Sequence, residues 1–235
     1  MTYIIVSIIL ASILGAFSAK FLLRGNHISL GFAGGAILGL VFLDIIPEVF
    51  EEAALLEVNT LVISGGLLMG FVVMHVLEKV SGFHEHDHGN HTPHTHSTGS
   101  VTIWTLSLHA LIDGVGIGAA YLVSQSLGTA ILFAFILHKF LDGMNIQAIA
   151  QASTAKNRKL FLMVNIIATI VGVLLVSNMN LSSTTLLCAT ALVGGVLLYV
   201  SSSHVLPEAH AHENSWRTIG ATLVGVLSVY ILSLI

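Results

Sequence analysis

Eight apolar runs dominate the sequence, and each approaches or exceeds the length of about 20 residues that a helix needs to cross the hydrocarbon core of a bilayer. They cover residues 2–22, 28–50, 60–80, 101–123, 127–151, 160–176, 183–208 and 218–235. Hydrophobic residues make up 55% of the 235-residue chain, and charged residues 9%. Because a backbone in lipid must satisfy its own hydrogen bonds, we expect an all-α polytopic membrane protein with eight transmembrane helices in a single domain, residues 1–235.

Basic residues predict the orientation of these helices, because Lys and Arg near helix ends favour the cytoplasmic side. The odd-numbered connections or their flanks hold seven of them: Lys20, Arg24, Lys79, Lys156, Arg158, Lys159 and Arg217. The even-numbered connections, 51–59, 124–126 and 177–182, hold none. We therefore expect an integral protein of the cell (inner) membrane with both termini on the non-cytoplasmic side. The first helix is expected to be retained rather than cleaved as a signal peptide.

Two polar segments inside the apolar runs repeat each other 29 residues apart, LHALIDG at 108–114 and LHKFLDG at 137–143. Each copy places a His four residues before an Asp, so both share one helix face about one turn apart. An Asp at the bilayer centre costs roughly 2.5–3.5 kcal/mol, and such residues usually mark ion or substrate pathways. We expect His109, Asp113, His138 and Asp142 to meet near the midplane as metal ligands. The alternative is a buried polar network that only packs the two helices.

Two imidazoles and two carboxylates suit Zn²⁺, which accepts nitrogen and oxygen ligands in tetrahedral geometry. The two carboxylate charges would balance one divalent ion. Ligand type separates first-row metals poorly, so Fe²⁺, Mn²⁺, Co²⁺ and Cd²⁺ also fit. We expect Zn²⁺ as the substrate of the site.

A second repeat, offset by 160 residues, surrounds the first. Gly34-Gly35 precedes DIIPE at 44–48, and Gly194-Gly195 precedes HVLPE at 204–208. The predicted topology runs the two copies in opposite directions, and inverted repeats of this kind are characteristic of transporters. We expect a three, two, three arrangement of helices with inverted repeats. Candidates for a gate or relay are Asp44, Glu48, His204 and Glu208; alternatively these residues only solvate helix ends at which Pro terminates regular structure.

At these residues the chain resembles the ZIP (Zrt/Irt-like protein) family of divalent metal transporters. The segment from His109 through Asp113 and Gly114 to Gly118 is similar to the family pattern of a His, variable residues, an acid and Gly on helix 4. The resemblance covers nearly the whole chain. It implies that His109, Asp113, His138 and Asp142 line a transport site, and that the protein carries Zn²⁺ or related ions inward by alternating access.

Three positions depart from many members of that family. Those members have Asn after the helix 4 His, an acid after the helix 5 His and an acid on helix 6, where this chain has Ala110, Lys139 and Asn165. In binuclear members these positions form a second metal seat. We therefore expect a mononuclear site in which the Lys139 ammonium occupies the second seat as a fixed cation paired with Asp142.

A polar low-complexity loop, residues 81–100, separates the third and fourth predicted helices. Six histidines lie within thirteen of its residues: His84, His86, His88, His91, His94 and His96. A tract of this composition cannot build a packed core and is typical of metal binding, with a solvated linker as the alternative. By the predicted topology it faces the cytoplasm, where it could collect ions or report their level.

Together these features predict a metal transporter and not an enzyme. The alternative is an intramembrane zinc-dependent hydrolase, which needs an open coordination position and requires neither an inverted repeat nor a cation-gathering loop. The partners we expect are metal ions and the lipid bilayer, with no nucleic acid, and a homodimer is left open.

Deleting residues 84–96 should leave metal flux intact and change its regulation, because the loop lies outside the predicted path. The measurement is metal uptake at increasing cytoplasmic metal concentration. Complete loss of flux in the deletion variant would instead make the loop part of the path.

Overall fold

A computed structural model describes residues 2–22, 27–81, 100–149, 155–210 and 216–234, and every element in these ranges is helical. The elements are α1 (Thr2–Leu22), α2 (His27–Leu40), η1 (Val41–Ile45), α3 (Ile46–Leu55), α4 (Thr60–Ser81), α5 (Ser100–Val123), α6 (Gln125–Ile149), α7 (Ala155–Ser177), α8 (Ser183–Tyr199), η3 (Val200–Val205), α9 (Leu206–His210) and α10 (Trp216–Leu232). The prediction of an all-α fold is confirmed for this part of the chain.

Six helical segments are long and apolar enough to cross a membrane. They are Thr2–Ala19, His27–Leu55, Thr60–Val80, Gln125–Met144, Asn157–Ser177 and Ser183–His210. Two shorter apolar helices, Ser107–Val123 and Trp216–Ile231, occupy the remaining predicted positions. Eight transmembrane helices in a three, two, three arrangement therefore stay a prediction.

The outer surface of the helical bundle is rich in large apolar side chains. In α4 only 11% of the apolar segment is buried, and Leu61 and Leu68 are 79% and 64% exposed. On α1, Phe17 is 64% exposed. Such large apolar patches are unusual on proteins that face water on all sides, so the surface composition agrees with a membrane protein.

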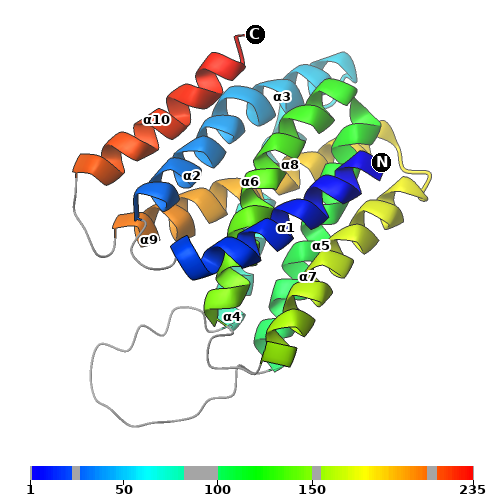
Figure 1. The fold of residues 1–235 in the computed structure, drawn as a ribbon. Coiled ribbons are helices and arrows are strands. Elements are labelled where there is room, and N and C mark those ends of the chain that lie inside the picture. Colours follow the sequence, from blue (N-terminus) through cyan, green and yellow to red (C-terminus); the bar gives the residue numbers. More distant parts are fainter. Residues whose placement is uncertain (1, 23–26, 82–99, 150–154, 211–215, 235) are drawn as a thin grey trace.

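Four pairs of helices make the most extensive contacts: α1 with α6, α2 with α10, α4 with α8, and α5 with α7 (Figure 1). Glycines let the backbones meet in each pair. A Cβ atom added to Gly114 of α5 would lie 2.0 Å from the Thr169 carbonyl oxygen of α7, and one added to Gly15 of α1 would lie 1.9 Å from the Phe140 carbonyl oxygen of α6. The two helices that carry the His and Asp residues are thus each held against a neighbour at backbone contact.

The contacts between α2–η1 and α8–η3 repeat at the same offset as the sequence. Gly34 faces Val205, at 3.1 Å from its added Cβ atom, and Gly194 faces Ile45 at 3.2 Å. Gly194 stands 160 residues after Gly34, and Val205 stands 160 residues after Ile45. The sequence repeat is therefore also a repeat in packing.

A widened helical turn precedes each of the two repeated prolines. The backbone N–H of Ile46 donates to the Val41 carbonyl, and that of Leu206 donates to the Ser201 carbonyl, five residues back in both cases. The helices predicted over 28–50 and 183–208 continue through Pro47 and Pro207, and the alternative in which Pro terminates regular structure is wrong. Proline crowds the preceding turn, and the widened π-type turn gives its ring room, so helix continues to Leu55 and His210.

Gly114→Ala should destabilise the protein by about 1–3 kcal/mol, since the new methyl group would overlap the α7 backbone and force α5 and α7 apart. Gly65→Ala is the matched control, because nothing lies within 4 Å of a Cβ atom there. It should be neutral, or stabilising by up to about 1 kcal/mol through helix propensity. Thermal unfolding in detergent compares them, and equal midpoints for both variants would contradict the close approach.

Candidate metal centre

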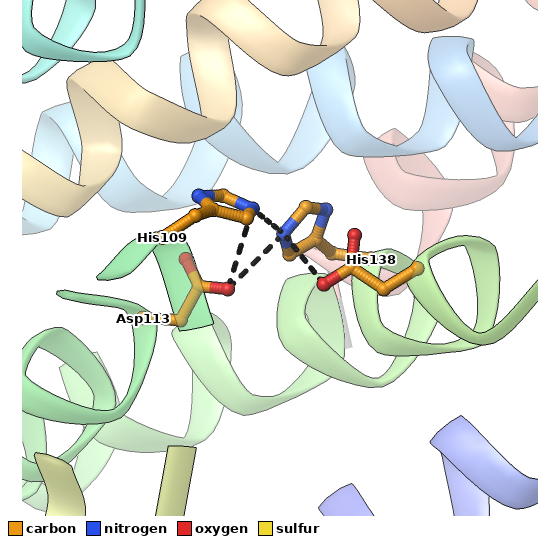
Figure 2. A group of neighbouring side chains, drawn as sticks. His109, Asp113 and His138 are labelled. Carbon is orange, nitrogen blue, oxygen red and sulfur yellow. Dashed lines mark hydrogen bonds and ion pairs between the residues drawn. The ribbon is translucent and has the colours of Figure 1, made fainter. Parts of the chain in front are cut away.

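Four ionisable side chains converge between α5 and α6. His109 and Asp113 come from α5, and His138 and Asp142 come from α6. One ligand atom from each lies within 4.8 Å of the others. Figure 2 shows the imidazoles of His109 and His138 facing each other with the Asp113 carboxylate beside them. The structure thus brings together the four residues predicted from their spacing, and the group can hold a metal ion.

The separations between these atoms fit a single small cation. His109 Nε2 lies 3.1 Å from His138 Nε2, and Asp113 Oδ2 lies 3.3 Å from His138 Nε2 and 3.6 Å from His109 Nε2. The distance from His138 Nε2 to Asp142 Oδ2 is 3.7 Å. Ligands about 2.0 Å from a tetrahedral Zn²⁺ are roughly 3.3 Å apart, so only small adjustments are needed to coordinate one.

The cluster is buried, and several of its polar atoms lack hydrogen-bond partners. The side chains of Asp113 and His138 are 0% and 1% exposed, and that of Asp142 is 13% exposed. Among the described residues, Asp113 Oδ1 and the Nδ1 atoms of His109 and His138 have no hydrogen-bond partner. A network selected only for packing would satisfy its members, so this pattern favours a functional site over a packing network.

Lys139 completes the cluster and is fully buried. Its Nζ atom lies 2.6 Å from Asp113 Oδ2 and donates a hydrogen bond of 3.0 Å to Asp142 Oδ2. Pairing with Asp142, three residues along the same helix, is confirmed. The contact with Asp113 on α5 could not be read from the sequence, because it depends on how α5 and α6 face each other. Occupation of a second metal seat by this ammonium stays a prediction.

The other two departures from the family pattern are also buried. Ala110 is 0% exposed on α5, and Asn165 is 2% exposed on α7. Asn165 lies one helical turn before Thr169, whose carbonyl oxygen contacts Gly114. Neither side-chain atom of the Asn165 amide has a hydrogen-bond partner among the described residues.

The gate or relay candidates lie outside the four-residue cluster. Asp44 accepts a hydrogen bond of 2.6 Å from Ser233 Oγ, and Glu48 accepts one from Ser126 Oγ. His204 Nδ1 lies 3.6 Å from Glu78 Oε1, while Glu208 is exposed. These contacts link η1 to Ser233 just after α10, α3 to α6, and η3 to α4. A role for any of the four in gating stays a prediction.

Glu78 is a buried acid that the sequence reading missed. It lies near the end of α4 and is only 4% exposed, close to His204. A carboxylate inside an apolar run could have indicated a buried acid at this position. Because Glu78 stands directly before Lys79, however, the two residues resemble a charged helix end. Its burial depends on how α4 packs against α8, which the sequence does not show.

The six histidines of the 81–100 loop are predicted to bind metal. His84, His86, His88, His91, His94 and His96 lie outside the described residues. Their predicted role in binding metal is untested.

No family model matches the chain, and no curated protein matches it in sequence. The fold and the site define an all-helical protein with membrane-length apolar helices and a buried His/Asp group that can hold a metal ion.

Lys139→Glu should raise the bound metal from one ion per chain to two, because a carboxylate would replace the fixed cation beside Asp113 and Asp142. Metal analysis of the purified protein measures the ratio. Lys79→Glu, a change of the same charge at an exposed position, is the control. A folded Lys139→Glu protein with one ion per chain would refute the second-seat hypothesis.

Proposed function

We propose that the protein is a divalent metal ion transporter that carries Zn²⁺ across the membrane toward the cytoplasm. The observation that supports this most strongly is the convergence of His109, Asp113, His138 and Asp142 from two apolar helices, one of which, α6, is long enough to cross a membrane. Ionisable residues in such helices usually lie on an ion or substrate path. In this proposal the four side chains form the substrate site near the midplane between α5 and α6.

Transport is favoured over hydrolysis by the number of ligands. A catalytic zinc site keeps a coordination position open for water, typically with three protein ligands. Here four residues each offer a ligand atom, and these atoms lie within 4.8 Å of one another, so the protein can supply four ligands and not three. An intramembrane zinc-dependent hydrolase therefore remains the second candidate.

The internal repeat supports alternating access as the mechanism. Transporters built from inverted repeats bind substrate where the repeats meet and move one part against the other. The contacts of Gly34 with Val205 and of Gly194 with Ile45 recur at the repeat offset. In the proposed topology, α2–α3 runs outward and α8–α9 runs inward, which places Asp44 and Glu48 at the entrance and His204 and Glu208 at the exit.

Resemblance to the ZIP family supports the same assignment from the order of the motifs along the chain. The family pattern implies inward movement of Zn²⁺, whereas the ligand set alone also accommodates Fe²⁺, Mn²⁺, Co²⁺ and Cd²⁺. The proposed protein is an eight-helix carrier of the cell membrane, with both termini on the non-cytoplasmic side.

His138→Ala should lower saturable zinc uptake into proteoliposomes at least about tenfold, because even changes in groups that only support metal ligands cost about 10- to 100-fold in affinity or activity. Radiolabelled zinc measures the flux. His75→Ala is the matched control, since it removes an imidazole from α4, outside the cluster, and should retain uptake.

Equal uptake by the two variants would contradict a path through the cluster. If the wild-type protein binds zinc but does not transport it, the intramembrane hydrolase becomes the favoured function. Folding is verified for each variant by gel filtration and helical circular dichroism before the flux is compared.

A further inference from the structure

We propose that Lys139 is a tethered counter-ion, which takes over the Asp113 and Asp142 carboxylates when the metal leaves and so allows the metal-free carrier to return. This inference rests on the proposed transport function. It assigns to Lys139 a step of the cycle, the return without substrate, that is separate from filling a second metal seat.

The geometry of the ammonium carries the argument. Lys139 Nζ contacts Oδ2 of Asp113 at 2.6 Å and Oδ2 of Asp142 at 3.0 Å. These are the same oxygen atoms that face the His138 imidazole in the metal-ligand group. Metal and ammonium therefore share their anionic partners. One fully buried lysine can strengthen its hold on both carboxylates when the metal departs, without any movement of the helices.

Formal charge shows why this matters for a buried site. With neutral imidazoles, two carboxylates and one ammonium give the site one net negative charge, and a bound divalent ion changes this to one net positive charge. Without the ammonium, the site would have two net negative charges when metal-free and no net charge with a divalent ion bound. The cost of burying charge grows steeply with its magnitude, so Lys139 makes the loaded and the metal-free site comparably costly to enclose.

Removal of the ammonium should therefore affect only one half of the cycle. A neutral side chain at position 139 leaves the loaded site uncharged, which favours passage with metal bound. It also leaves two uncompensated carboxylates in the metal-free site, which opposes the return. Net uptake requires that return, whereas exchange of metal for metal does not.

The test compares these two fluxes in proteoliposomes reconstituted with full-length Lys139→Gln. Net uptake is measured into metal-free vesicles, and exchange is measured as radiolabelled zinc entering vesicles loaded with unlabelled zinc. We expect net uptake to fall at least about tenfold while exchange stays within about twofold of wild type or rises. Lys139→Arg keeps the charge and should recover net uptake, and Lys79→Gln, on an exposed residue of α4, should leave both fluxes unchanged.

Zinc binding in detergent provides a readout independent of transport. Lys139→Gln should bind zinc more tightly than wild type, because the competing cation is gone. Equal losses of net uptake and exchange in a variant that binds zinc, or no loss of either, would overturn the counter-ion role. Wild-type protein with neither flux would instead refute the proposed transport function. If Lys139→Gln does not fold, Lys139→Met replaces it, and failure of both neutral variants to fold would assign the ammonium to structure and overturn the proposal.

Discussion

Compensation of two buried carboxylates is the constraint on which the rest of the structure depends. Asp113 is fully buried, and its Oδ2 atom is approached by Lys139 Nζ and by the Nε2 atoms of His109 and His138. Removing one partner of a buried ion pair costs about 3–5 kcal/mol, so α5 and α6 must hold these groups in register. A helix shift of one residue would turn an Asp toward apolar neighbours.

Backbone contact between helices meets that requirement. In lipid, helices gain little from hiding apolar side chains from one another, and close packing through small residues supplies much of the association. Gly114 and Gly172 bring α5 and α7 together, while Gly15 and Gly143 do the same for α1 and α6. The two helices that carry the candidate metal ligands, α5 and α6, are thus each packed closely against a neighbouring helix. The side chains of the cluster are left to face each other across the α5–α6 contact.

The periodic features of the fold could be predicted from the sequence, and the contacts across helices could not. The 2–22 run matches α1, and the four-residue spacing of His109 and Asp113 fixed their common face. The predicted 28–50 helix does continue through Pro47, but the sequence does not show the widened turn that accommodates the proline. The contact of Lys139 with Asp113 and the burial of Glu78 depend on how neighbouring helices face each other. Interhelical register is a property of packing, and no single helix encodes it.

The two copies of the repeat offset by 160 residues have the same backbone conformation before their prolines but carry different side chains. The two copies are therefore chemically unlike. Each copy contains a π-type turn before its proline, in the same register. At equivalent positions one copy has Asp44, hydrogen bonded to Ser233, and the other has His204 beside the buried Glu78. Under the proposed orientation, an incoming cation meets Asp44 and Glu48 first and the His204 imidazole beside Glu78 last. In the proposed transport cycle, the shared backbone would suit equivalent opening on both sides, and the unlike side chains would give each side its own affinity for the ion.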